Sequence, residues 1–216
     1  ERGQWLPREA ANWDSHEVFV KNRYVPADSW LDADGKPFQP GVHYWVGGAT
    51  KVYGAALYRL RREDFGELKH HDGVSPAWPI SYDDLEPYYE KAEWEIGVSG
   101  DDSNNIFRAP RKRPLPMPPL PPTREYEMLK PAAKRLGLHP FDIPMLRNSV
   151  PYNGRGACMR CRWCVGFACE GDAKCGTQNT VIPRAIDTGN CELRTECIAK
   201  QILTDDRGHV TGVAYF

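Results

Sequence analysis

Five of the seven cysteines fall in one short stretch of the chain, between positions 158 and 175. Their spacing is C-x2-C-x2-C-x4-C-x5-C. Thiolates at such short intervals are typical ligands of a metal ion or a metal cluster. We therefore take four of them as candidate metal ligands and the fifth as a spare thiol. The candidate ligands are Cys158, Cys161, Cys164 and Cys169, and the spare is Cys175.

The spacing alone leaves three alternatives open for these cysteines. Its first three members resemble the thiolate run of a bacterial ferredoxin, which wraps an iron–sulfur cluster. For a zinc ion, Cys158 and Cys161 would combine either with the next two cysteines or with the distant Cys191 and Cys197, although the first excursion is very short for a zinc ribbon. The third alternative is a set of disulfides, with one thiol left over, or of small buried side chains.

A second stretch that could bind a ligand contains the paired glycines Gly47 and Gly48, which follow an aromatic and β-branched run. Paired glycines allow positive φ angles and let the backbone approach a ligand closely. The plain alternative is a turn before a helix, because the small residues that follow include apolar positions at helical spacing.

Composition excludes some classes of function. The chain has 216 residues, enough for one large or two small domains. Its net charge of −1 with 26% charged residues gives no signal for binding nucleic acid. No apolar run is long enough to span a membrane, and the six histidines show no ligand spacing. Because the chain starts at Glu1 without methionine and ends in an apparent strand, we expect it to be a piece of a longer polypeptide.

Two helices should position these stretches. Ser81 is a good N-cap for the first, Asp84 stands at the capping-box position, and Gly97 is a stop signal. Pro87 leaves open whether this segment forms one helix or two. The second helix runs from the cap Thr123 to Gly137.

The remaining segments are shorter or extended. The proline-rich residues 109–122 predict a stiff connector across the surface, and the alternative is an arm that docks on an SH3-like groove. A short helical piece is expected at 180–186. Strands are expected at 17–20, 191–195, 199–204 and 209–216, the last two joined by a hairpin turn at 205–208. These elements predict a loop-rich, mixed α+β fold.

Three stretches, in this order, resemble the glucose-methanol-choline (GMC) family of flavin oxidoreductases. Residues 44–54 are similar to that family's Gly-Gly loop beside the flavin, and residues 78–89 to the opening of its substrate domain. The block from Cys158 through the strands up to Val213 is similar to the return into its FAD-binding domain. The subgroup most similar is that of the bacterial membrane-linked sugar and gluconate dehydrogenases, which implies the bacterial cytoplasm or periplasm.

The resemblance implies an FAD-dependent enzyme that removes hydride from a carbon bearing an alcohol and passes it to the flavin. Its substrate would be a small alcohol or sugar, and its electron acceptor a cytochrome or a quinone. By carry-over, the flavin would lie against Gly47, Gly48, Thr50 and Gly54, and the adenosine side near Cys197 and Ala199.

The resemblance also divides the chain. Residues 1–75 would form a flavin-proximal segment of the FAD-binding domain, and 76–150 a segment of the substrate domain with the proline-rich connector. Residues 151–216 would carry the cysteines and the return strands of the FAD-binding domain. In this arrangement the cysteine run is an accessory, and an iron–sulfur relay is conditional because many members of the family lack one.

The sequence departs from the family pattern in several places. Ala49 stands where a hydroxyl residue is common and Tyr53 where asparagine is common, which weakens side-chain but not backbone arguments there. No G-x-G-x-x-G turn follows an N-terminal strand, and no histidine matches the catalytic base. We therefore expect residues 1–216 alone to be inactive and to bind no stoichiometric FAD. The competing hypothesis is a zinc-stabilised interaction module with a proline-rich arm.

Overall fold

The computed structural model describes all 216 residues, and they form two compact units. Unit 1 comprises Glu1–Gly54, Arg162–Glu170 and Gly176–Phe216, and unit 2 comprises Ala55–Cys161 and Gly171–Cys175. The secondary structure consists of α-helices, short 3₁₀ and π-helical turns and two-stranded antiparallel sheets. The predicted mixed α+β class is therefore confirmed, whereas the assignment of segments to an FAD-binding and a substrate domain stays a prediction. No helix has the length and apolar character needed to span a membrane.

Unit 1 contains mostly short elements around a small apolar cluster. The cluster is formed by Val18, Tyr24, Val52 and Phe167. The elements of unit 1, in chain order, are η1 (Ala10–Trp13), η2 (His16–Val20), β1 (Trp30–Leu31), β2 (Pro37–Phe38), η3 (Gly48–Lys51), η5 (Thr177–Asn179), α3 (Val181–Asp187), β7 (Ala199–Thr204) and β8 (Val210–Tyr215).

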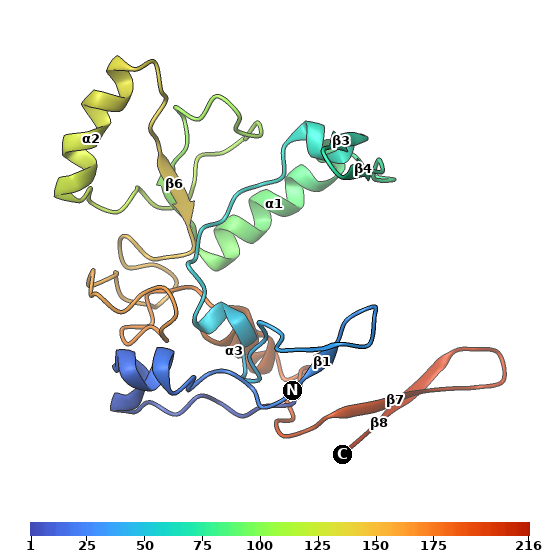
Figure 1. Cartoon of the computed structure of the whole chain (residues 1–216). Helices are drawn as coiled ribbons and strands as arrows, with labels where there is room; N and C mark the ends of the chain where they lie inside the picture. Colours follow the sequence, from blue (N-terminus) through green and yellow to red (C-terminus); the bar gives the residue numbers. More distant parts are fainter. The chain divides into compact units, whose positions relative to one another are not determined.

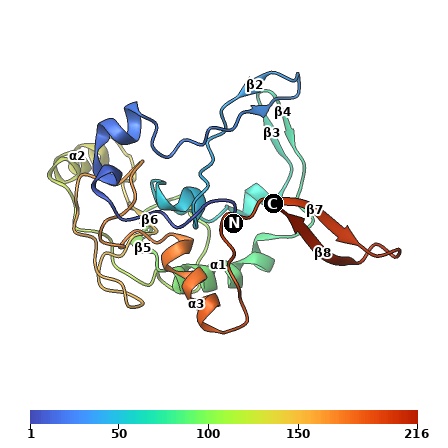
Figure 2. The same ribbon diagram turned by 90° about the horizontal axis from the view of Figure 1, so that it is seen from below.

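The most regular part of unit 1 is the antiparallel hairpin of β7 and β8 (Figures 1 and 2). The turn predicted at 205–208 closes it, with Asp205 N donating to His209 O and Gly208 N donating to Asp205 O. Every residue of β7 is exposed. The two chain termini lie at the base of the hairpin, where Cys197 N donates to Glu1 O and Ile198 pairs with Phe216.

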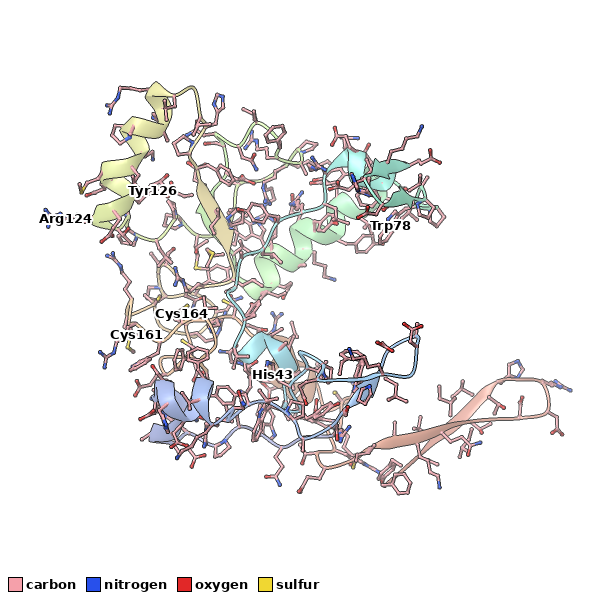
Figure 3. The ribbon with its side chains drawn as sticks, in the orientation of Figure 1. His43, Trp78, Arg124, Tyr126, Cys161 and Cys164 are labelled. Atoms are coloured by element: carbon pink, nitrogen blue, oxygen red, sulfur yellow. The ribbon has the colours of Figure 1, made fainter.

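Unit 2 is built around α1, whose residues Tyr82, Leu85 and Tyr89 pack in one apolar cluster with Phe65 and Ala109. Trp78 lies at the N-terminal end of this helix, beside the β3–β4 hairpin (Figure 3). The elements of unit 2 are η4 (Arg62–Phe65), β3 (Leu68–His70), β4 (Gly73–Ser75), α1 (Tyr82–Ile96), β5 (Ser99–Asp101), α2 (Arg124–Arg135) and β6 (Asp142–Met145).

Both long helices begin and end where their capping residues predict. Ser81 Oγ accepts a hydrogen bond from Asp84 N, and the Asp84 carboxylate accepts one from Ser81 N, which completes a capping box. Thr123 caps α2 in the same way through Tyr126 N. Pro87 lies inside one continuous helix, because near the first turn its missing N–H leaves only one helical carbonyl without its donor.

A buried ionic cluster ties α1 to the chain segments beside it. The Arg59 guanidinium is bidentate to Glu93, at 2.9 and 2.7 Å, and also contacts Glu86 at 3.3 Å. Burial by itself lowers the pKa of Arg59, but the bonds to Glu93 and Tyr82 outweigh it and raise the pKa above its ordinary value. The arginine therefore stays charged, because its ion pairs and hydrogen bonds offset the cost of burying the charge.

The proline-rich segment is extended without regular secondary structure, but it does not simply cross the surface. Met117 is 1% exposed, its N–H donates to Val98 O, and Gly100 N donates to Met117 O. The connector is thus bound to β5 at its middle, because the non-proline residue Met117 supplies the backbone donor that its neighbours lack.

Two predicted strands are wrong. Residues 17–20 belong to the π-helical turn η2, because Asp14 Oδ1 accepts from His16 N and Glu17 N and so favours a helical start over the β-branched pattern. Residues 191–195 are irregular. They have no partner strand, and the chain beside them bonds instead to the N-terminal residues, with Glu196 N donating to Gly3 O.

Candidate cofactor site

The paired glycines form a left-handed turn that starts a single 3₁₀ turn. Gly47 has φ +96° and Gly48 has φ +51°, a region that favours glycine. Gly47 caps η3, and the hydroxyl of Thr50 donates to the carbonyl oxygen of Gly47. The segment after the glycines is therefore one short turn and not the longer helix that its apolar spacing indicates.

The residues just after the cysteine run hold this glycine turn from the other side. Thr177 N donates to Thr50 Oγ1 at 3.1 Å, and the two threonine hydroxyls lie 3.4 Å apart. The side chain of Thr50 is thus engaged with the protein on two sides. Its role in the structure is to fix the shape of the glycine turn.

The side chain of Gln178 lies directly against two glycines. A Cβ placed on Gly47 would lie 2.4 Å from Gln178 Oε1, and a Cβ placed on Gly176 would lie 2.1 Å from the same atom. Oε1 is buried and has no hydrogen-bond partner within the protein. An amide oxygen in this state is costly, so its position against the glycine turn is a specific feature of the site.

The first residues of the chain connect the glycine turn with Cys197. Val46 N donates to Gln4 O, and on the other side Cys197 N donates to Glu1 O, both at 3.0 Å. Gly3 is required between them, because a Cβ there would overlap the carbonyl oxygen of Tyr44. Two stretches that are far apart in sequence and that both carry predicted cofactor residues are thus joined through one backbone segment.

The other predicted cofactor residues are placed less tightly. Gly54 has no positive φ, and a Cβ there would make only an ordinary 3.8 Å contact with Val165. Ala199 is exposed and pairs with Tyr215 in the β7–β8 hairpin. These two positions therefore show no local feature that requires their residue type.

His43 precedes the glycine turn in the chain and lies close to η3 (Figure 3). Its Nδ1 is 2.9 Å from the carbonyl oxygen of Tyr24, and its own carbonyl oxygen lies 3.7 Å from the Cβ position of Gly48. The ring is thereby oriented by the backbone of a neighbouring segment.

The structure gives no support for the metal site predicted at Cys158, Cys161, Cys164 and Cys169. The structure holds no group of three or more Cys, His, Asp or Glu side chains placed to bind a metal ion. Cys158 and Cys161 belong to unit 2, whereas Cys164 and Cys169 belong to unit 1. Close spacing of the cysteines along the chain is therefore not matched by a metal-binding group.

The spare thiol is a core residue of unit 2. Cys175 is 2% exposed, and its sulfur lies 3.2 Å from Arg155 Nη1 and 3.4 Å from both Asn148 Oδ1 and Gly97 O. Its backbone N–H also donates to Leu146 O. Packing and hydrogen bonding within the protein therefore account for this cysteine.

Sequence reasoning missed Thr177 and Gln178 as part of the site. The only local signal is the run of small and polar residues at 176–180, directly after Cys175. Their contact with the glycine turn is a tertiary one, so no spacing rule could reveal it.

Comparison with known proteins places the chain in a broader context. A family model described as GMC oxidoreductase matches residues 41–216. The chain is 38% identical over 188 residues to 6'''-hydroxyparomomycin C oxidase of Streptomyces lividus, covering 86% of this chain and 33% of that protein. It is 27% identical over 214 residues to the fructose dehydrogenase large subunit of Gluconobacter japonicus, covering 97% and 38%.

A third relative is the gluconate 2-dehydrogenase flavoprotein of Pantoea cypripedii. It is 29% identical over 207 residues, which cover 82% of this chain and 33% of that protein. The chain thus spans about a third of the length of these relatives.

Proposed function

We propose that this chain, which belongs to the GMC oxidoreductase family, is part of an FAD-dependent enzyme that oxidises a CH–OH group of a small alcohol or sugar. The observation that carries the proposal is the family match over residues 41–216, which includes the glycine turn. The names of two relatives, a fructose dehydrogenase and a gluconate 2-dehydrogenase, support a sugar or sugar acid as the substrate class.

The residues around the glycine turn fit a bound flavin nucleotide. The backbone of Gly48 has space beside it, since His43 O at 3.7 Å is the one atom close to its Cβ position, so a flat ligand would be able to approach closely there. The buried Oε1 of Gln178 is a hydrogen-bond acceptor that still needs a donor. When bound, FAD would accept the hydride that leaves the substrate carbon.

Within this proposal the chain's residues bind and orient the cofactor. Gly47 and Gly48 lie against the isoalloxazine or the pyrophosphate through their backbone, with Gly54 at the end of the same segment. Thr50 fixes the turn, because its hydroxyl is engaged with Gly47 O and Thr177 N. Cys197 and Ala199 approach the adenosine side, an assignment that rests on the family resemblance alone.

Electron exit toward a cytochrome or a quinone would make the enzyme a dehydrogenase. Two of the relatives described above bear dehydrogenase names and one bears an oxidase name, so both outcomes occur in this family. An iron–sulfur relay is not part of the proposal, since no metal-holding group is formed by the cysteines. The zinc-stabilised interaction module has no supporting observation for the same reason.

The experiment uses the full-length protein. Purified protein should show flavin absorbance at one FAD per chain, and the absorbance should bleach under anaerobic conditions with at least one member of a panel of sugars, sugar acids and primary alcohols. Gly47→Val should lose the flavin, whereas Gly41→Ala, at a glycine with no atom within 4 Å of its Cβ position, should keep it. A protein without flavin, or a flavin that no member of the panel reduces, would contradict the proposal.

A further inference from the structure

The segment that carries Gln178 is held rigidly on both sides. Asn179 Oδ1 accepts from Gly176 N at 3.0 Å, and Thr180 Oγ1 donates to Gly176 O at 2.8 Å. Thr177 N is bound to Thr50 Oγ1. The backbone of η5 is therefore fixed, and the side chain of Gln178 is directed against the glycine turn by the chain itself.

Packing does not explain why this residue is polar. The glutamine side chain fills the space that a Cβ on Gly47 or Gly176 would otherwise occupy. A methionine of similar length and volume would fill the same space and would leave no buried oxygen without a partner. A buried amide oxygen without a partner lowers the stability of the fold, and a donor from outside this segment would recover that free energy.

We propose that Gln178 is a flavin-binding residue whose Oε1 accepts a hydrogen bond from a donor group of the bound flavin. This inference rests on the proposed function. The pyrophosphate of FAD offers only acceptors, and the proposed function assigns the adenosine, with its own donors, to the side of Cys197 and Ala199. The donor beside the glycine turn is then the N3–H of the isoalloxazine or a ribityl hydroxyl. The glycines at 47 and 176 then leave the space that the carboxamide occupies.

The test compares Gln178→Met with the wild type in the full-length protein. Apoprotein is titrated with FAD, and binding is followed by quenching of flavin fluorescence. We expect Q178M to bind FAD about 2- to 12-fold more weakly, the range of one neutral hydrogen bond. Because the substitution removes a buried unsatisfied oxygen, the thermal midpoint of the Q178M apoprotein should be equal to or higher than that of the wild type. Gln201→Met, at an exposed glutamine of β7, should change neither quantity.

A second arm identifies the donor with FAD methylated at N3. If N3–H is the donor, methylation weakens binding to the wild type but causes little further loss in Q178M. If a ribityl hydroxyl is the donor, methylation changes both proteins by the same factor, and the Q178M defect persists. Equal affinity of Q178M and the wild type for FAD would overturn the inference and leave the proposed function intact. A wild-type protein that binds no FAD would overturn both.

Discussion

Gln178 Oε1 lies 2.4 Å from the position that a Cβ on Gly47 would take, although the two residues are far apart in sequence. Two features make any residue other than glycine unfavourable at position 47. The left-handed backbone disfavours any L side chain, and the carboxamide occupies the space of a Cβ. The glycine turn is thus defined as much by η5 as by its own residues.

Gly47→Ala should therefore destabilise the turn and weaken flavin binding. The backbone strain alone should cost about 1–2 kcal/mol of unfolding free energy, and displacement of Gln178 adds to it. Denaturant unfolding and FAD titration of the full-length protein measure the two effects. Gly41→Ala is the matched control, and an equal response of both variants would refute this assignment.

Glu86→Gln should lower the unfolding free energy at neutral pH by about 1–3 kcal/mol. Glu86 is 4% exposed and accepts from Arg59 and Lys112. Burial raises its pKa, but the hydrogen bonds from Lys112 and Arg59 outweigh burial, so the pKa lies below its ordinary value of 4.5.

The sign of the pH dependence follows from this lowered pKa. The contribution of the Glu86 carboxylate to the unfolding free energy is present above pH 4.5 and is lost as the pH falls through the lowered folded-state pKa. The difference between wild type and E86Q should therefore shrink in acid, as measured by urea unfolding between pH 7 and pH 3. Glu90→Gln, on the same helix but in a partly exposed pair with Arg113, should cost less than about 1 kcal/mol at any pH.

Ser81→Ala should destabilise α1 by about 1 kcal/mol, because it removes the side-chain acceptor for Asp84 N at the start of the helix. The effect should appear as a lower urea midpoint with an unchanged slope. Ser75→Ala, at an exposed serine in β4 whose hydroxyl bonds only to the exposed His70 ring, should change the free energy of unfolding by no more than about 0.5 kcal/mol. A Ser81→Ala variant as stable as Ser75→Ala would mean that the capping box does not stabilise α1.

The double variant Cys158→Ser, Cys161→Ser should leave metal content and flavin content unchanged. The structure forms no metal-holding group, and Cys158 is a free thiol. Iron, zinc and acid-labile sulfide are measured per chain in the full-length wild type and in the variant. Stoichiometric iron with sulfide that disappears in the variant would restore the iron–sulfur interpretation.

Residues 1–216 produced alone should bind no stoichiometric FAD. The chain spans about a third of its relatives, and it contains no G-x-G-x-x-G turn for the pyrophosphate. Flavin absorbance after reconstitution and gel filtration measures this directly. A yellow protein with one FAD per chain would show that this segment holds the complete site.

Local signals in the sequence predicted the helices well. Ser81 and Gly97 mark the ends of α1, and Thr123 and Gly137 mark the ends of α2. Capping is predictable because it depends on the residues at the helix ends themselves. The β7–β8 hairpin was predicted for a similar reason, since its turn is local. The strand at 191–195 was wrong because a strand needs a partner that sequence pattern does not supply.

The sequence by itself determined the family, the α+β class and the glycine pair at 47 and 48. These depend on residue types and on their order along the chain. Only the tertiary structure decided that Cys158 and Cys164 belong to different units and that Gln178 lies against Gly47. Both outcomes are set by where distant segments pack, because burial and hydrogen-bond satisfaction are properties of the folded chain and not of spacing within it.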